Sequence, residues 1–247
     1  MKRLLASTAL LATLATGATA QDLTPMSDEE RALFRAEVRA YLFENPEVIM
    51  QAVEILQNRE ADAQVQADID LVSQNADALF NDGYSWVGGN PDGDIVLVEF
   101  LDYRCGYCKR AHGEVAELIR ADGNIKLVVK ELPILGESSV LASRFAVAVK
   151  QVAGNDSYKA VHDAMMSVNG DINMPTLRRL AGTFGLDMDA VEARMDSEEV
   201  TAEIAATRAL AGALAISGTP TFVMQDELLR GYLPLDQMQA RIAEKRG

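Results

Sequence analysis

Cysteine and histidine are scarce in this 247-residue sequence, which contains two of each. Both cysteines lie in a Cys-Gly-Tyr-Cys motif at residues 105–108, so a structural zinc site would need both of them together with His112 and His162. A purely structural disulfide within the motif would close a very short loop and remove little entropy from the unfolded chain. The ligand shortage and the short loop therefore argue against both structural uses of the cysteines.

Positive charge and long hydrophobic runs are scarce as well. The chain has 23 Lys and Arg against 37 Asp and Glu, for a net charge of −14. Such an acidic protein repels phosphate groups, and we therefore expect no nucleic-acid partner. No apolar run reaches the length of about 20 residues that a transmembrane helix requires, so we also expect no membrane insertion.

Residues 1–20 have the pattern of a secretory signal peptide. Lys2 and Arg3 precede an apolar stretch, and an Ala-Thr-Ala cleavage sequence ends at Ala20. Because the apolar stretch is too short for a retained anchor, we expect cleavage after Ala20 and export to the periplasm. Disulfides form and persist in such an oxidising compartment, which suits a working dithiol.

Glycine is absent from residues 22–81, which we predict to be helical nearly throughout. The capping box Ser27–Glu30 predicts a first helix over about 28–44. Pro46 suits the first turn of a second helix, whose apolar residues we expect to point inward. These are Val48, Ile49, Val53 and Leu56.

A narrow apolar stripe continues through this region in alternating steps of four and three residues, as in a coiled coil. It consists of Val65, Ile69, Val72, Ala76 and Leu79. The stripe can pack either on the rest of the chain or on copies of itself. Because it is narrow and the helix is long, we predict a homo-oligomer formed through residues 28–80.

Glycine-rich segments around residues 83 and 88–93 interrupt the helical pattern. We therefore predict an N-terminal helical domain at 21–82, through which the chain oligomerises, and a second domain at 83–247. The second domain begins with a hydrophobic strand at 95–101, a helix opened by the cysteines and a strand at 125–130. Strand, helix and strand in this order indicate a parallel unit.

The rest of the chain is predicted to be mainly helical, with one hairpin. Alanine-rich amphipathic segments at about 137–216 are broken at glycine and proline positions and indicate several helices. Two short strands within 221–230 form a predicted hairpin, and a final helix covers 235–246.

The position of the cysteines predicts their chemistry. The first turn of a helix offers unpaired N–H groups and about half a positive charge, which lower the pKa of a cysteine placed there. Cys105 is therefore the predicted nucleophile. Cys108 returns to the same side of the helix, where it can attack a mixed disulfide on Cys105 and release the substrate.

The element order, the stretch Phe100–Cys108 and the Gly218-Thr-Pro220 loop together resemble the DsbA-like branch of the thioredoxin superfamily. The resemblance implies an α/β thioredoxin-like fold with a helical insertion, preceded by an all-α N-terminal segment. Residues 41–52 resemble the helical leader of the ScsC/Com1 group within this branch.

The resemblance also implies roles for individual residues. Glu99, six residues before Cys105, matches a buried acid that moves protons to or from Cys108. Thr219 and Pro220 match a cis-proline loop that binds an extended substrate strand, and Gly106 and Tyr107 complete the predicted substrate surface. The alternatives are a surface-facing Glu99 on an edge strand and a trans proline in an ordinary loop.

One departure from the branch bears on function. Strongly oxidising members carry Pro-His between the cysteines, whereas Gly106-Tyr107 supplies no imidazolium to stabilise the thiolate. We therefore expect a milder oxidoreductase that leans toward disulfide isomerase or reductase, acts on unfolded or misfolded exported proteins and has a membrane redox partner. A dithiol oxidase and a Cu(I)-binding protein of copper tolerance that uses the same thiols are the alternatives. We expect no cofactor and no resident metal.

Three further features have ordinary structural interpretations. We expect His112 to face solvent on its helix. His162 with Met165, Met166 and Met174 could form a soft copper site, but core packing is the favoured interpretation. Trp86 is expected to pack near the first strand of the second domain, with a role in a peptide groove as the alternative.

Overall fold

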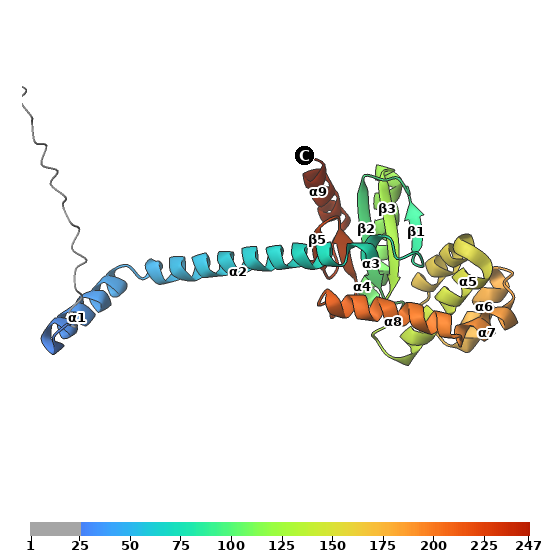
Figure 1. Ribbon diagram of the computed structural model, residues 1–247, viewed down its shortest axis with the longest axis horizontal. Helices are drawn as coiled ribbons and strands as arrows, with labels where there is room; N and C mark the ends of the chain where they lie inside the picture. The colour runs from blue at the N-terminus through green and yellow to red at the C-terminus, as the bar shows by residue number, and fades with distance from the viewer. Residues whose placement is uncertain (1–25) are drawn as a thin grey trace, which may run out of the picture. The chain divides into compact units, whose positions relative to one another are not determined.

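A computed structural model describes residues 26–247, which fall into two compact units that meet at Arg59 and Glu60. The first unit holds α1 (Asp28–Glu44) and the beginning of α2 (Glu47–Gln74), both coloured blue in Figure 1. The predicted capping box is present, because the Glu30 N–H donates to Ser27 Oγ at 3.2 Å and the Ser27 N–H donates to the Glu30 carboxylate at 2.9 Å. This reciprocal pair explains why the helix begins where the sequence predicted.

The apolar residues that the structure describes in the first unit, within 26–59, are not buried. No residue of α1 is buried, and Ile49, Val53 and Leu56 are exposed while Val48 is half-buried. The prediction that this group points inward is therefore wrong for the described part of the single chain, because residues 26–59 form no second layer over it. The predicted export signal and its cleavage after Ala20 lie outside the described residues.

The second unit starts before the boundary predicted at 82–83. Val72 of α2 and Leu79 of α3 (Ala76–Phe80) are buried in one cluster with Val98 and Phe100 of the sheet. The later part of the predicted stripe thus packs within the second unit, whereas Val65 at its start is exposed.

The second unit is built on a five-stranded sheet in the order β1-β3-β2-β4-β5. Its strands are β1 (Trp86–Gly89), β2 (Ile95–Leu101), β3 (Ile125–Glu131), β4 (Thr221–Met224) and β5 (Glu227–Arg230). β2 and β3 are parallel and the other neighbours are antiparallel, which confirms the predicted parallel unit and the hairpin.

The helices of the second unit also follow the prediction. They are α4 (Gly106–Asp122), α5 (Glu137–Met166), α6 (Met174–Thr183), α7 (Met188–Met195), α8 (Glu198–Ala213) and α9 (Leu235–Arg246). Gly154 interrupts α5 with φ 86° and ψ 179°, a conformation that glycine adopts without steric cost. The helices α5 to α8 form the predicted insertion between β3 and β4, and the thioredoxin-like α/β fold is confirmed.

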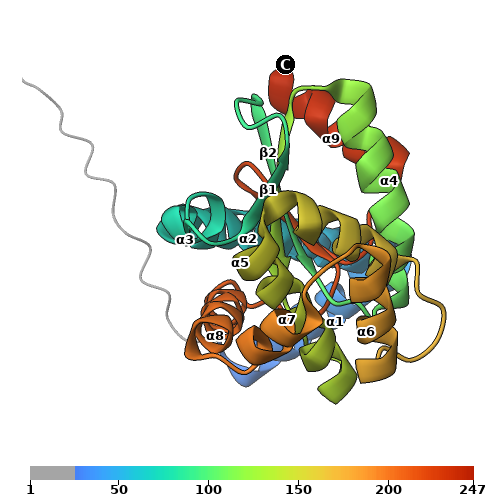
Figure 2. The ribbon, with the colours of Figure 1, turned by 90° about the vertical axis from the view of Figure 1, so that its right-hand side faces the viewer.

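Successive residues of β2 face opposite layers. Leu97 and Leu101 belong to a core with buried residues of α4, α5 and α9, and Val98 and Phe100 belong to a core with residues of α2, α3 and α8. Figure 2 places α4 and α9 on one side of the sheet and α3 on the other. Because β2 lies inside the sheet between β3 and β4, the cysteine motif at its C-terminal end starts from the most enclosed strand.

Candidate functional site

The two cysteines occupy different environments at the start of α4. Cys105 is the N-cap residue, its Sγ accepts the Cys108 N–H at 3.4 Å, and 7% of its surface is exposed, whereas Cys108 is fully buried. The hydrogen bond from the Cys108 thiol, helped by the N–H groups of Cys108 and Tyr107, lowers the pKa of Cys105 to about 5. The same thiol hydrogen bond and burial raise the pKa of Cys108. These shifts favour the thiolate form of Cys105 and the protonated form of Cys108. The roles of nucleophile and resolving cysteine stay predictions.

Asp102 holds the turn before Cys105 in place, a role that the sequence did not predict. Its buried carboxylate accepts N–H groups of Arg104 at 2.8 Å, Ile134 at 2.9 Å and Leu135 at 3.0 Å, and the hydroxyl of Ser139 at 2.8 Å. The carboxylate thus ties the cysteine turn to the segment between β3 and α5.

The loop before β4 lies against the nucleophile. The Thr219–Pro220 peptide bond is cis, and the Sγ of Cys105 lies 3.1 Å from the Thr219 carbonyl oxygen. A hollow of about 240 Å³ follows this loop and is lined by residues 217–221 with Arg230 and Gly231. The structure thus brings Thr219 and Pro220 together with Cys105, as the resemblance implied, while their contact with substrate remains a prediction.

Tyr107 extends the site outward from the motif. It is 62% exposed, and its ring centroid lies 6.0 Å from that of Tyr232. The Arg110 guanidinium lies over the Tyr232 ring at 4.6 Å, and the Tyr232 hydroxyl donates to Glu114 at 2.6 Å. Gly106 is exposed beside this pair of rings, so both residues predicted to meet substrate lie on the accessible side of the motif.

Glu99 is buried beneath the cysteine helix, so the alternative of a surface-facing edge position is wrong. β2 has a neighbouring strand on each side, and the Glu99 Oε1 has no hydrogen-bond partner. Desolvation, followed by the charges of Glu131 and Cys105, raises the pKa of Glu99 to about 8. Its carboxyl group therefore keeps a proton near neutral pH and is able to exchange it.

A second buried acid was missed. Glu131, at the end of β3, accepts the hydroxyls of Tyr103 at 2.7 Å, Tyr158 at 2.6 Å and Ser143 at 2.8 Å. Burial raises its pKa to about 7, and the three hydroxyl donors oppose that rise. The only signal in the sequence was an acidic residue directly after the predicted strand 125–130.

His112 was predicted to face solvent, but it is only partly exposed. Its Nε2 lies 3.1 Å from Asp163 Oδ1, and its ring packs edge-on to His162 at 5.0 Å. The pairing joins α4 to α5, a long-range contact that helical periodicity does not reveal. Neither cysteine belongs to this cluster, so among residues 26–247 the four-ligand zinc set does not assemble.

Two other interpretations are confirmed by burial. Met165 and Met166 lie in the main core with His162, and Met174 packs against that core, as expected for packing residues. Trp86 is buried, stacks on Tyr158 at 5.7 Å and donates its indole N–H to the Asn155 carbonyl at 3.2 Å.

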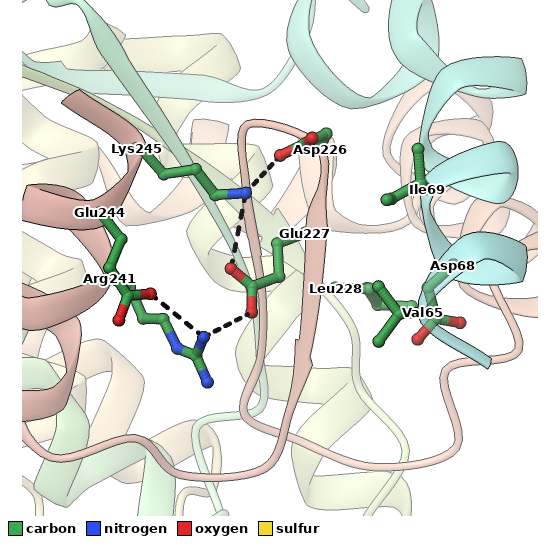
Figure 3. Close-up of a pocket in the computed structure, with 9 residues that line it drawn as sticks. All are labelled: Val65, Asp68, Ile69, Asp226, Glu227, Leu228, Arg241, Glu244 and Lys245. Atoms are coloured by element: carbon green, nitrogen blue, oxygen red, sulfur yellow. Dashed lines mark hydrogen bonds and ion pairs between the residues drawn. The ribbon is translucent and has the colours of Figure 1, made fainter. Parts of the chain in front are cut away.

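A larger hollow of about 330 Å³ lies between the end of α2, the β4–β5 hairpin and α9 (Figure 3). Its cations Arg241 and Lys245 pair with acidic neighbours that include Asp226 and Glu227. Since its charges are mutually neutralised and no cysteine lines it, we assign no chemistry to this hollow.

Comparison with known proteins identifies matches for both parts of the chain. Residues 96–243 match the DSBA-like thioredoxin domain, and residues 30–63 match the copper resistance protein ScsC N-terminal domain. A thioredoxin-like oxidoreductase from Silicibacter pomeroyi is 44% identical, with a TM-score of 0.65, and the match covers 69% of this chain and 96% of that one.

Two further solved structures are similar. The thiol-disulfide exchange protein alpha-DsbA2 from Wolbachia pipientis is 28% identical, with a TM-score of 0.69 and coverage of 74% of this chain and 98% of that one. Proteus mirabilis ScsC in a transitional conformation is 27% identical, with a TM-score of 0.66 and coverage of 89% and 98%.

Curated relatives match in part only. A Na(+)/H(+) antiporter NhaA 3 from Salinispora tropica is 25% identical over 63% of this chain, and the match spans 24% of the antiporter's length. Within residues 26–247, no helix has the length and apolar character needed to cross a membrane. The matched span of residues 96–243 contains both cysteines and the cis-proline loop, and the chain belongs to the family of DsbA-like thioredoxin domains, the thiol:disulfide oxidoreductases of the DsbA and ScsC type.

Proposed function

We propose that this protein rearranges disulfides of exported proteins in the periplasm, acting as an isomerase or reductase in preference to a net oxidase. The observation that carries the proposal is the asymmetry of the two thiols. Cys105 has a lowered pKa and keeps 7% of its surface exposed, and Cys108 is fully buried with a raised pKa. Rearrangement of an incorrect substrate disulfide requires attack by a free thiolate.

The reaction begins when the Cys105 thiolate attacks one sulfur of a substrate disulfide. A Cys105–substrate disulfide forms, and the other substrate sulfur leaves as a thiolate. In isomerisation, a different substrate thiolate attacks the mixed disulfide and regenerates Cys105 with no net change of oxidation state. In reduction, Cys108 loses its proton, attacks the Cys105 sulfur and releases the substrate with both of its sulfurs reduced.

Glu99 is suited to receive the Cys108 proton. Its carboxyl group lies on the sheet face that α4 covers, and its negative charge contributes to the raised pKa of Cys108. The minor fraction of Glu99 that is ionised near neutral pH accepts the proton as Cys108 attacks and returns it when the disulfide is reduced again. A membrane-bound dithiol donor would supply the two electrons that restore the reduced pair.

The lean toward isomerisation rests on what stabilises the thiolate. The contributors that lower its pKa are neutral hydrogen-bond donors, led by the Cys108 thiol, and Gly106-Tyr107 adds no imidazolium. A less strongly stabilised Cys105 thiolate makes the Cys105–Cys108 disulfide a weaker oxidant. The Cys105–substrate disulfide is then more readily rearranged.

Self-association supports the same function. Exposed apolar residues of the first unit would be covered if copies of the chain associate through the predicted 28–80 region. They include Leu33, Phe34, Val38, Phe43, Ile49 and Leu56. Such an assembly presents several Cys105 thiolates to one misfolded substrate.

The test is recovery of activity by a scrambled multi-disulfide protein, with the mature chain, Cys105→Ser and a chain starting at Glu60. We expect turnover by the mature chain, none by Cys105→Ser, and slower isomerisation with a monomeric mass by light scattering for the shortened chain. Activity that survives Cys105→Ser contradicts the proposal. Oxidation of a reduced substrate without reshuffling would favour the oxidase, and stoichiometric Cu(I) binding without disulfide exchange would favour the copper protein.

A further inference from the structure

We propose that His112, His162 and Asp163 form a binding site for one divalent cation of intermediate softness, such as Zn²⁺, separate from the two cysteines. The site goes beyond the proposed function and does not depend on it. It unites the only two histidines of the chain, His112 from α4 and His162 from α5. Imidazole nitrogens with a carboxylate oxygen are a recurrent ligand set for zinc.

The ligand atoms already lie close together. One potential ligand atom from each of the three side chains falls within 4.8 Å of the other two. His112 Nε2 and Asp163 Oδ1 are 3.1 Å apart, near the separation of about 3.3 Å that follows for two ligands held at about 2.0 Å on a tetrahedral ion. Because His112 is partly exposed, a small rotation of its side chain is available to complete the set.

A buried oxygen of Asp163 has one close polar neighbour, the Nε2 of His112 at 3.1 Å. Asp163 Oδ1 is inaccessible to solvent and has no hydrogen bond, although His112 Nε2 is close to it. The other oxygen, Oδ2, pairs with Lys159. Oδ1 therefore keeps lone pairs directed into the cluster, and a cation between Asp163 and His112 would satisfy them.

The hydrogen-bond network orients His162 for coordination. The Tyr103 hydroxyl lies 2.7 Å from Glu131 Oε1 and 2.9 Å from His162 Nδ1, and it has one proton to donate. When that proton goes to Glu131, His162 Nδ1 must donate to the tyrosine oxygen, which leaves the lone pair on Nε2. Metal-binding histidines are commonly oriented by such a hydrogen bond from their other nitrogen.

A cavity gives the ion access and space. A hollow of about 190 Å³ under α4 is lined by His112 and His162, with Glu99 and Lys159 also in its wall. A water molecule occupies about 30 Å³ in the liquid, so the cavity has room for the water that would complete four-coordination.

A bound ion would link helix α4, which carries the cysteines, to helix α5 of the insertion. The Lys159 ammonium opposes a second cation, and we expect micromolar affinity.

The experiment measures Zn²⁺ binding to the mature chain in a Cys105→Ser/Cys108→Ser background, which removes the thiolates as ligands. Titration calorimetry should give one equivalent, and Co²⁺ should give the visible absorption bands of a four-coordinate site. His112→Gln and Asp163→Asn should each weaken Zn²⁺ binding more than tenfold. The matched controls Glu117→Gln on α4 and Asp156→Asn on α5 are both exposed and should leave the affinity unchanged.

A second measurement does not depend on variants folding. The chain contains two histidines, so the imidazole region of a two-dimensional NMR spectrum should show two ring systems, and both should shift on Zn²⁺ addition to the double-serine protein. Absence of saturable binding, an affinity unchanged by His112→Gln and Asp163→Asn, or imidazole signals unmoved by Zn²⁺ would each overturn the proposal.

Discussion

The Sγ of Cys105 lies 3.1 Å from the carbonyl oxygen of Thr219, in a contact that joins the start of α4 to the loop before β4. A protonated thiol donates a hydrogen bond to that carbonyl, whereas a thiolate has no proton to donate. Ionisation of Cys105 therefore leaves the Thr219 carbonyl without this donor. If the loop binds a substrate strand as predicted, this carbonyl is free to accept an N–H group from the strand when the sulfur is a thiolate.

Titration of the thiolate absorbance near 240 nm should give a midpoint of about 5 for Cys105. Because the Cys108 thiol is the largest cause of the lowered pKa, Cys108→Ala should move the midpoint upward. Cys105→Ala should abolish the transition near pH 5, because the remaining Cys108 thiol is fully buried and burial raises its pKa. A midpoint for the native protein near the usual cysteine value of about 8.5 would show that the helix start does not activate the sulfur.

The stability of the reduced protein should depend on pH in a predictable direction. The folded-state pKa of Cys105 is lowered from 9.0 to about 5, so between these values the unfolded chain binds one more proton than the folded chain. The Cys105 thiolate thus contributes fully to the free energy of unfolding above pH 9, and this contribution is lost as pH falls through 5. The free energy of unfolding changes by at most about 1.4 kcal/mol per pH unit in this range.

The control for this prediction is the oxidised protein, which has no thiol to titrate at either position. Urea unfolding of both forms at pH 5, 7 and 8.5 gives the difference in their free energies of unfolding. We expect the free energy of unfolding of the reduced protein minus that of the oxidised protein to become more positive with rising pH. A difference that stays flat over this range is incompatible with a thiolate buried at the N-cap.

Local sequence signals predicted the elements that local physics controls. The helix of α1 begins after Ser27 because the capping box is complete within four residues, and Cys105 caps α4 because a hydrophobic strand ends just before it. Both positions needed only neighbours in sequence.

Contacts between distant residues were not predictable in this way. Asp102 is placed by N–H groups beyond β3, and the pairing of His112 with Asp163 depends on how α4 and α5 pack. The exposed Ile49 and Val53 were misjudged for a related reason. An apolar stripe predicts that a helix needs a partner, but it does not say whether that partner is the same chain.

Glu99→Gln should stabilise the oxidised protein at neutral pH but not in acid. Burial, the largest cause, raises the folded-state pKa of Glu99 above 4.5 in either redox state, so near neutral pH the folded chain holds a proton that the unfolded chain releases. The stabilisation by the protonated carboxyl group is fully present below pH 4.5 and is lost as pH rises through the folded-state pKa. The buried glutamine amide adds an effect that does not change with pH.

Thermal unfolding of the oxidised native and Glu99→Gln proteins at pH 4 and 7.5 measures this effect. The stability of the variant relative to the native protein should increase between the two pH values, while the exposed Glu117→Gln control should show no such change. If Glu99 also receives the Cys108 proton, the variant should release its mixed disulfide more slowly. Equal pH dependence in both proteins would mean that Glu99 is ionised in the fold.

Asp102→Ala should both destabilise the protein and slow disulfide exchange. The substitution leaves three backbone N–H groups and the Ser139 hydroxyl without their buried acceptor. Unsatisfied buried donors cost about 1–3 kcal/mol each before water enters, so we expect a loss of about 3 kcal/mol or more in the free energy of unfolding. Exposed Asp156→Ala should change that free energy by less than about 0.5 kcal/mol.

The two effects of Asp102 separate at a temperature where the variant is still folded. The carboxylate fixes the turn that places Cys105 at the N-cap, so alkylation of Cys105 by iodoacetamide at pH 6 should be slower in folded Asp102→Ala because the thiolate fraction falls. Asp102→Asn keeps one acceptor oxygen and should lie between the alanine variant and the native protein in both measurements. Native alkylation rates in a destabilised but folded Asp102→Ala would restrict the role of Asp102 to stability and leave the activation of Cys105 to α4 alone.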